Sequence, residues 1–182
     1  DDLRKAEDDY AKSKAEAEIG LLQIASETKL EIVIIRSPLV YGPGVKANFA
    51  ALLKLASKNF PLPFGSIKNK RGFVAIDNLV SLIVTCLDHT QAANQIFLVS
   101  DDNDISTSDL FNIMVKAFGK KPRSFKLSPM LLKIVAGIIG KKTIIDRLCN
   151  DLRIDIKHTK KSLNWKPVVS TAEGVKLCVS NT

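Results

Sequence analysis

Hydrophobic and polar positions follow two different patterns near the start of the chain. Between about Asp9 and Thr28, alanines and aliphatic residues recur at helical spacing with lysines and glutamates between them, which predicts an amphipathic helix. The run Glu31–Arg36 instead carries four consecutive aliphatic residues without alternation. Such a run is typical of a strand buried on both faces of a parallel sheet. A helix followed by a buried strand predicts an α/β fold.

The later elements are marked mainly by caps, glycines and prolines. Ser106 and Ser170 each open a capping box, and Ser128 precedes a proline that suits the first turn of a helix. The segment Phe60–Gly65 holds two prolines and is expected to be stiff and extended. Two further helices are predicted, one over 48–58 and one through Leu87 with Asp77 as its N-cap. Strands are predicted over 72–76, 95–99 and 153–155, and a turn held by Trp165 is predicted over 163–167.

Composition narrows the class of protein. With 182 residues, of which 46% are hydrophobic and 25% charged, the chain can bury a core and reads as one globular domain or a large part of one. The net charge of +8 indicates an anionic partner, which can be nucleic acid, a membrane surface or a phosphorylated small molecule. The widely spaced Cys86, Cys149 and Cys178 favour reduced thiols and a cytoplasmic location, and the two isolated histidines indicate no metal site.

Tyr10 and Lys14 form a Tyr-x-x-x-Lys pair at the head of the first predicted helix. Residues four apart on a helix lie on the same face, so the phenol and the ammonium would be neighbours. A nearby ammonium lowers the pKa of a phenol from about 10 towards neutrality, where the phenol can exchange a proton with a substrate hydroxyl. The same spacing also occurs on ordinary solvated helix faces, so the pair alone leaves both interpretations open.

Five motifs in one order favour the catalytic interpretation. They are Tyr10-x-x-x-Lys14, Arg36-Ser37-Pro38, Tyr41-Gly42-Pro43-Gly44, Arg71-Gly72-Phe73-Val74 and Leu163-Asn164-Trp165-Lys166-Pro167. The series spans essentially the whole chain and resembles the extended short-chain dehydrogenase/reductase family, in particular nucleotide-sugar epimerases and dehydratases of the UDP-glucose 4-epimerase type. The resemblance implies the C-terminal part of a Rossmann-type parallel sheet plus a smaller mixed α/β substrate-binding domain. Residues 1–45 would be a remnant of the NAD-binding domain, and residues 46–182 would mainly bind the nucleotide sugar, with some elements returning to the Rossmann sheet.

The resemblance also implies a cofactor site near the first helix and strand. Tyr10 would be the base that takes a proton from a sugar hydroxyl. Lys14 would lower the pKa of Tyr10 and hold the nicotinamide ribose of NAD, with NADP as the alternative cofactor. Pro38 and Val40, which follow the predicted strand, would lie beside the nicotinamide.

A second group of residues would bind a UDP-sugar. Asn48 and Arg71 match diphosphate contacts of the family, and a guanidinium suits this role because it can donate two parallel hydrogen bonds to one phosphate. The remaining candidates are Leu62 and Phe64 beside the uracil, and Arg147, or alternatively Arg153, at a second phosphate contact.

Three features depart from the family pattern. The 182 residues contain no Gly-x-x-Gly-x-x-Gly loop, which in the family holds the dinucleotide pyrophosphate, and the family's upstream catalytic Ser or Thr is missing. We therefore expect the chain to be the C-terminal part of an epimerase that lacks roughly its first 130 residues, to be inactive by itself and not to bind NAD tightly. Leu39 stands where UDP-glucose epimerases have an Asn that contacts the substrate, which leaves the identity of the sugar open.

Three function classes follow from these features. The leading one is an NAD-dependent epimerase that oxidises and re-reduces C4 of a UDP-sugar for surface-polysaccharide biosynthesis, and that forms a homodimer through the Tyr10 helix when intact. The second is a reductase or dehydratase of a 4-keto nucleotide sugar. A basic nucleic-acid-binding module is the remote alternative, because the lysines are scattered and only 6% of residues are aromatic. A membrane partner is not expected, because the most apolar window, 127–140, is too short to span a bilayer.

Overall fold

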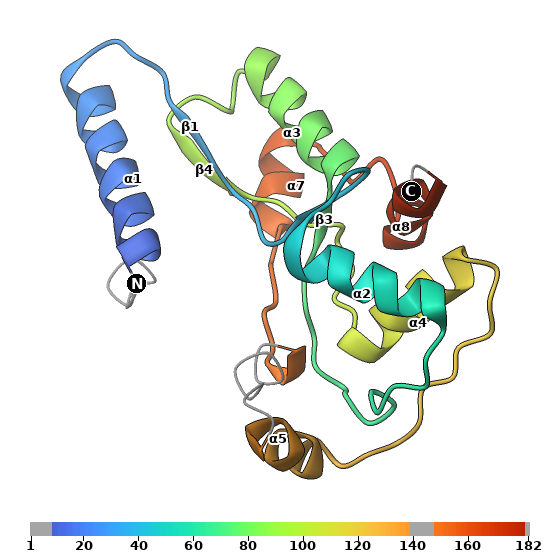
Figure 1. Ribbon diagram of the computed structural model, residues 1–182. Helices are drawn as coiled ribbons and strands as arrows, with labels where there is room; N and C mark the ends of the chain where they lie inside the picture. Colours follow the sequence, from blue (N-terminus) through green and yellow to red (C-terminus); the bar gives the residue numbers. More distant parts are fainter. Residues whose placement is uncertain (1–8, 139–147, 181–182) are drawn as a thin grey trace.

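The computed structural model describes residues 9–138 and 148–180 of the chain. It confirms the predicted mixture of helices and parallel strands (Figure 1). In chain order the elements are α1 (Asp9–Glu27), β1 (Val33–Arg36), β2 (Val40–Tyr41), α2 (Ala47–Lys58), β3 (Val74–Ala75), α3 (Ile76–Asp88), β4 (Gln95–Leu98), α4 (Thr107–Ala117), α5 (Pro129–Ile138), α7 (Lys157–Leu163) and α8 (Thr171–Ser180).

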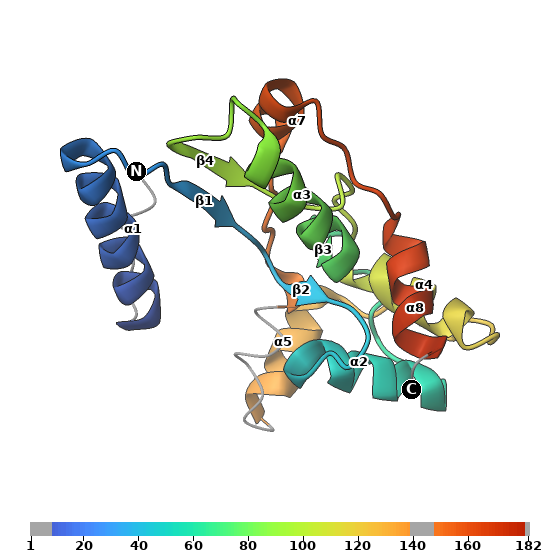
Figure 2. The ribbon, with the colours of Figure 1, turned by 90° about the horizontal axis from the view of Figure 1, so that it is seen from above.

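Two pairs of parallel strands form the sheet part of the fold. β1 pairs with β4, beginning with Val33 opposite Gln95, and β2 pairs with β3, beginning with Val40 opposite Val74. Figures 1 and 2 both show the β1–β4 pair between α1 on one side and α3 with α7 on the other. β1 is less buried than the sequence predicts, because only Ile34 of its four residues is buried. Among the described residues β1 has one hydrogen-bonded neighbour, so its second edge adds exposed surface.

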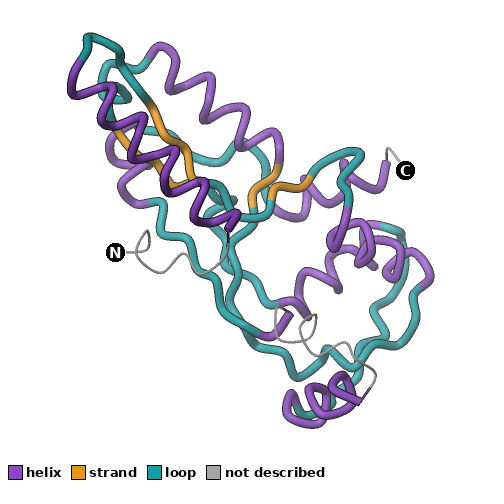
Figure 3. Tube along the Cα trace, turned by 60° about the vertical axis from the view of Figure 1, so that its left-hand side comes forward, coloured by secondary structure: helices purple, strands orange, loops and turns teal. Residues whose placement is uncertain are grey.

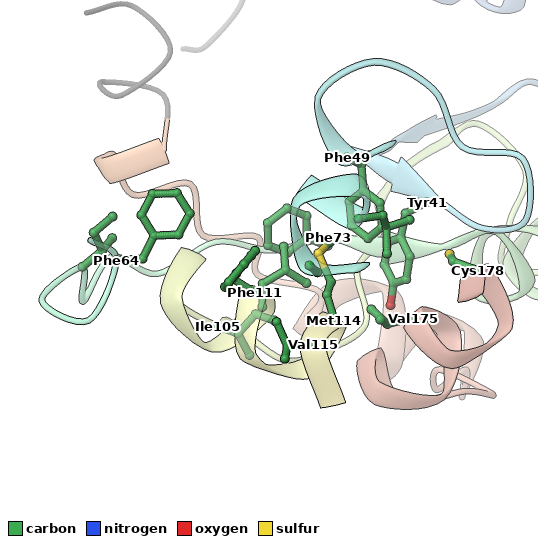
Figure 4. Packing of buried hydrophobic residues seen from close by; sticks show 14 of the residues in the cluster. Tyr41, Phe49, Phe64, Phe73, Ile105, Phe111, Met114, Val115, Val175 and Cys178 are labelled. Atoms are coloured by element: carbon green, nitrogen blue, oxygen red, sulfur yellow. The ribbon is translucent and has the colours of Figure 1, made fainter. Parts of the chain in front are cut away.

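Two buried clusters of side chains hold the elements together. In the larger cluster, Tyr41 stacks on Phe49 with 4.8 Å between ring centroids, and Phe64 meets Phe111 edge-on at 5.6 Å (Figure 4). The smaller cluster is centred on β4, α3 and the region of Trp165. Trp165 is 5% exposed, which confirms its predicted role as an anchor, but Leu163 ends α7 and residues 164–167 form an irregular segment in place of the predicted turn.

A buried carboxylate joins four parts of the fold. Asp101 follows β4 and is only 7% exposed. It accepts hydrogen bonds from the hydroxyl of Tyr41 at 2.6 Å, from Nδ2 of Asn78 at 2.7 Å, from the backbone N–H of Ala75 at 2.8 Å and from the hydroxyl of Thr171 at 3.2 Å. Because these donors come from β2, β3, α3 and α8, one side chain fixes the relative positions of these elements.

Two local predictions at the element boundaries are wrong. α3 begins at Ile76, with Ala75 as its N-cap, and Asp77 lies in the first helical turn. The N–H of Ala75 donates to Asp101, so a distant side chain binds the backbone at the start of the helix. No strand forms over 153–155, because the bridge to Arg71 falls one residue earlier, at Leu152.

The segment 60–65 is extended only in its first part. Residues 63–66 form a turn in which the N–H of Ile67 donates to the carbonyl of Phe64 at 2.9 Å. The helix α7 does not appear in the sequence prediction, because its seven residues carry no apolar stripe. The capping boxes are confirmed, since Ser106 and Ser170 each accept a hydrogen bond from the backbone N–H of the residue three positions later.

Helices and long connecting segments make up most of the described chain, and the strands between them are short (Figure 3). None of the helices within residues 9–138 and 148–180 is long and apolar enough to cross a membrane.

Candidate functional site

An ion pair fixes the helix that carries Tyr10 and Lys14 against the end of β1. One carboxylate oxygen of Glu18 accepts from Nη2 of Arg36 at 2.6 Å, and both oxygens accept from Nε at 3.1 Å. The Glu18 side chain is only 18% exposed, and Ala15 on the same helix is buried. This forked geometry restrains the rotation of α1 as well as its distance from β1.

The ion pair also sets which side of α1 faces the strand. Tyr10, Lys14 and Glu18 are four residues apart, so they occupy one side of the helix. α1 and β1 run in opposite directions (Figure 1). The eight residues from Glu18 back to Tyr10 cover about 12 Å of helix. Because α1 and β1 run in opposite directions, the backbone of Tyr10 lies beyond the Arg36 end of β1; its side chain lies outside the described residues.

The segment between β1 and β2 is a bend at the carboxyl end of a parallel strand, which is where ligands bind in open α/β sheets. Pro38 and Val40 are partly buried, and Leu39 is 36% exposed. The carbonyl of Leu39 accepts from the N–H of Val74 at 3.2 Å, so backbone pairing holds the bend in place.

The residues present fit one end of NAD. A partly buried apolar bend beside a helix with a Tyr-x-x-x-Lys pair suits the nicotinamide and its ribose. The pyrophosphate needs backbone N–H groups at a glycine-rich turn before a helix, and the sequence contains no Gly-x-x-Gly-x-x-Gly pattern that would form one. The 182 residues can therefore contact the reactive end of the dinucleotide but do not contain its phosphate cradle.

Arg71 is held by its backbone between two neighbouring segments. Its N–H donates to the carbonyl of Ile105 at 3.0 Å, and the next residue, Gly72, donates to the carbonyl of Leu152 at 2.8 Å. The guanidinium lies 5.9 Å from the ring centroid of Phe73, and partial burial lowers its pKa. An arginine stays charged even so. A fixed and partly desolvated cation of this kind is well suited to an anionic ligand.

Asn48 and Arg71 each lie close in sequence to a residue of the larger cluster. Asn48 is exposed in the first turn of α2 and does not cap the helix, because Lys46 is the N-cap. Phe49, next to Asn48, and Phe73, two residues after Arg71, both belong to the larger cluster (Figure 4). The residues next to the two predicted diphosphate contacts thus share one core.

Phe64 lies in that cluster too, but its ring is used for packing. The ring is 5% exposed and meets Phe111, so it offers no free face to a base. Nearby, the N–H of Phe125 donates to the carbonyl of Leu62 at 3.0 Å, and the N–H of Gly65 donates to the carbonyl of Phe125 at 3.0 Å. A uracil beside Leu62 and Phe64 would meet backbone groups and not the aromatic face. Only glycine fits at position 65, since a Cβ there would lie 2.9 Å from the Phe125 backbone.

Arg147, the candidate for a second phosphate contact, lies outside the described residues. Its alternative, Arg153, is exposed, and its Nη2 lies 3.8 Å from Oδ2 of Asp151. Glu18 and Arg36, the pair that orients α1, are not among the residues predicted from the sequence. Their signal was present, because Glu18 is four residues after Lys14 on the same helical side and Arg36 ends the predicted strand.

Comparison with known proteins gives consistent matches. Residues 2–100 match the model of the NAD dependent epimerase/dehydratase family. The chain is 50% identical over 177 residues to the UDP-glucose 4-epimerase of Vibrio cholerae, a match that covers 97% of this chain and 54% of the relative. It is 25% identical over 181 residues to the dTDP-4-dehydro-6-deoxyglucose reductase of Escherichia coli, covering 96% of this chain and 52% of that protein. The chain thus spans about half the length of the curated relatives that it matches.

Solved structures show the same fold. A UDP-glucose 4-epimerase from Thermotoga maritima, crystallised with UDP-glucose, matches with a TM-score of 0.63 and 22% identity over 94% of this chain and 52% of that chain. A dTDP-glucose 4,6-dehydratase from Bacillus anthracis, in complex with NAD, matches with a TM-score of 0.68 and 16% identity over 96% of this chain and 51% of that chain. These matches confirm the predicted fold class, an α/β fold with parallel strands of the Rossmann type.

Proposed function

The chain belongs to the NAD dependent epimerase/dehydratase family, and we propose that it forms the substrate-binding side of an enzyme that epimerises a UDP-sugar at C4. The observation that carries this proposal is the 50% identity to a UDP-glucose 4-epimerase, in a match that covers 97% of the chain. The activity belongs to a protein in which these residues act together with a dinucleotide-binding half. We also propose a cytoplasmic location and a role in surface-polysaccharide biosynthesis.

In this proposal the residues of α1 handle the proton. Tyr10 removes a proton from the C4 hydroxyl of the sugar and later returns one, and Lys14 stabilises the phenolate form of Tyr10. The Glu18–Arg36 ion pair keeps this side of α1 turned towards the bend that contains Pro38. NAD, when bound, supplies the acceptor and donor of hydride.

The second group of residues binds the nucleotide. The guanidinium of Arg71 and the amide of Asn48 contact the diphosphate, and the backbone of Leu62 and Phe64 lies beside the uracil. Arg147 stays the candidate for a second phosphate contact. Support for the role of Arg71 comes from its partly buried, backbone-fixed position, which differs from that of an ordinary surface cation.

A reductase of a 4-keto nucleotide sugar is the second candidate. It is favoured by Leu39, which stands where the resemblance places a substrate-contacting Asn in UDP-glucose epimerases, and by the match to a dTDP-4-dehydro-6-deoxyglucose reductase. The two candidates differ in how they use the dinucleotide. Tightly retained NAD in an active protein supports epimerisation, whereas stoichiometric consumption of added NADPH supports reduction.

A chimera tests the proposal. The residues of the Vibrio cholerae relative that precede its matched region are fused to Asp1, and interconversion of UDP-glucose and its C4 epimer is followed. We expect turnover, and we expect Tyr10→Phe to lower it by about 100-fold while UDP binding is retained, which is the usual scale for a general acid or base. Lys12→Ala is the matched control, because Lys12 is exposed and two residues from both Tyr10 and Lys14. Undiminished turnover in Tyr10→Phe would remove this residue from the mechanism.

The chain by itself gives a second test. Calorimetric titration should show weak, salt-sensitive binding of UDP, because the nucleotide contacts lie within these residues. It should show no tight binding of NAD, because the residues that hold the NAD pyrophosphate in the family do not lie within this chain. Stoichiometric NAD binding would mean that the cofactor site is misplaced.

A further inference from the structure

A cavity of about 460 Å³ opens where α2, α4 and α8 meet. Its wall is mostly apolar and includes Val45, Leu53, Phe118 and Cys178. The volume falls within the range of sites that hold small organic molecules, roughly 300–1,000 Å³. Burial raises the pKa of the Cys178 thiol, so this part of the wall is uncharged at neutral pH.

The cavity lies away from the predicted nucleotide contacts. Ala50, Lys54 and Ser57 line it and occupy one side of α2, at positions spaced four and three residues apart. Asn48 is two residues before Ala50, which corresponds to roughly 200° of rotation around the helix. The cavity and the proposed diphosphate contact are therefore on nearly opposite sides of α2.

The mouth of the cavity is positively charged. Lys54 belongs to the lining and is exposed, and it forms no ion pair with a carboxylate in the described parts of the chain. The ammonium of Lys120 donates to the carbonyl of Ser57, another lining residue, so a second cation is held next to the lining without being part of it. The lining residues include no Asp or Glu, so the rim favours a negative group over a positive one.

We propose that this cavity is a binding site for a free single-chain amphiphile with an anionic headgroup. The apolar tail fills the space between Leu53, Phe118 and Cys178, where it is removed from water. The headgroup stays at the mouth and accepts hydrogen bonds from the ammonium groups of Lys54 and Lys120. The inference does not depend on the proposed epimerase function, since it uses none of the residues assigned to that function.

Alkyl phosphates test the proposal by calorimetric titration of the 182-residue chain. Octyl phosphate should bind, and hexyl phosphate should bind about 15-fold more weakly, since it lacks two methylenes and each methylene transferred from water is worth roughly a factor of four. Octyl glucoside, which has the same tail and a neutral headgroup, should bind at least about fivefold more weakly than octyl phosphate. Equal affinity for all three compounds would overturn the proposal.

Variants locate the site. Lys54→Ala should weaken octyl phosphate several-fold and leave octyl glucoside unchanged. Lys58→Ala is the matched control, because Lys58 is on the same helix but lies over the ring of Phe60, 6.0 Å from its centroid, and does not line the cavity. Ala50→Phe should fill the cavity and abolish binding. If Ala50→Phe does not fold, Ser57→Leu replaces it, because the Ser57 hydroxyl bonds only within its own helix in the described structure. Binding that survives a folded filling variant, or that falls equally in Lys58→Ala, would overturn the assignment.

Two further measurements distinguish this cavity from the nucleotide site and from a membrane-binding surface. Saturating UDP should not compete with octyl phosphate, and competition would show that the phosphate occupies the nucleotide site instead. The net charge of +8 favours phosphatidylglycerol over phosphatidylcholine vesicles in any case, but co-sedimentation should be the same for the unmodified chain and for Lys54→Ala, because a cavity between helices admits a free molecule and not a bilayer lipid. If co-sedimentation depends on Lys54, the proposal of a free ligand is overturned and this face binds a membrane surface instead.

Discussion

The phenol of Tyr41 makes the stability of the protein depend on pH. Tyr41 is 1% exposed and its hydroxyl donates to Asp101 at 2.6 Å. Burial raises the pKa of Tyr41 well above its ordinary value, and the negative charge of Asp101 raises it further. The unfolded chain releases this proton near pH 10, while the folded chain keeps it. The stabilising contribution is therefore complete below about pH 10 and is lost as pH rises further.

We expect urea unfolding to detect this effect. Between about pH 10 and about pH 11, the free energy of unfolding should fall by up to about 1.4 kcal/mol more in the unmodified chain than in Tyr41→Phe. The variant will be less stable at neutral pH, because Asp101 loses a donor, so the comparison uses the slope with pH and not the absolute value. Parallel slopes for the two proteins would contradict the assignment.

Substitution of Asn78 should destabilise the fold more than substitution of most other polar residues. It is fully buried, its amide nitrogen donates to Asp101 and to the carbonyl of Val169, and its carbonyl accepts from the N–H groups of Val168 and Val169. Asn78→Ala leaves these buried groups without partners and should cost about 3 kcal/mol or more in the free energy of unfolding. Asn103→Ala, at an exposed position, should change it by less than about 0.5 kcal/mol. A small effect of Asn78→Ala in urea unfolding would mean that the cluster relaxes around the gap.

Sequence reasoning reaches local pairs of residues and misses distant ones. The spacing of Tyr10 and Lys14 is visible because helical periodicity acts over four residues. The bonds of Asn78 and Asp101 join residues 23 to 91 positions apart, and nothing in a single sequence marks which Asp meets which Asn. Phe64 illustrates the same limit, since only the fold shows that its ring packs on Phe111 and faces no ligand.

At the scale of elements, the ion pair between Glu18 and Arg36 should control how firmly α1 is attached. In Figures 1 and 2, α1 stands beside the β1–β4 pair and apart from the other helices. Glu18→Gln removes the charge and one strong bond, and should raise amide hydrogen exchange in α1 several-fold while α2 and α4 keep their rates. Glu16→Gln is the control, because Glu16 is exposed on the same helix. Equal exchange in both variants would show that Ala15 and its neighbours suffice to hold α1.

Element prediction succeeded where a signal was local and failed where a partner set the boundary. The caps at Ser106 and Ser170 are short-range features, and both helices start where they predict. α3 starts one residue before Asp77, at a point where Asp101 binds the N–H of Ala75. α7 escaped detection because only Thr159 and Leu163 of its residues are buried, which is too few to produce a periodic pattern.

At the scale of the whole molecule, the order of motifs predicted the fold and the family, but not which surfaces remain uncovered. The apolar pattern of residues 76–88 indicates a helix with a strongly hydrophobic character, and it does not tell which side is buried. In the structure Asn78 and Leu82 face inward. A stripe of large aliphatic residues on the same helix is 38–77% exposed, and consists of Ile76, Val80, Ile83, Val84 and Leu87.

A second apolar surface lies on α1, where Ile19 is 55% exposed and Leu22 is 36% exposed. The prediction that α1 forms a homodimer contact in the intact protein concerns this surface. Within the part of the chain that the structure describes, one edge of β1 has no strand partner, and it is a third site at which another chain can add, since an open strand edge presents backbone groups for pairing. The chain therefore exposes more than one contiguous region able to associate, and their contributions can be separated experimentally.

We expect the 182-residue chain to self-associate with increasing concentration in sedimentation velocity, because contiguous exposed aliphatic stripes are rarely left uncovered in monomeric proteins. The α3 stripe is the longest of these surfaces, so Val80→Lys combined with Val84→Lys should shift the distribution towards monomer. Thr90→Lys combined with Gln91→Lys adds the same charge at two exposed positions outside the stripe and should leave association unchanged. Ile19→Lys combined with Leu22→Lys tests the α1 surface in the same way. If only the double variant on α1 restores the monomer, association runs through the predicted dimer helix and the α3 stripe is not an associating surface in this chain. A single monomer boundary for the unmodified chain at all concentrations would contradict association through either surface.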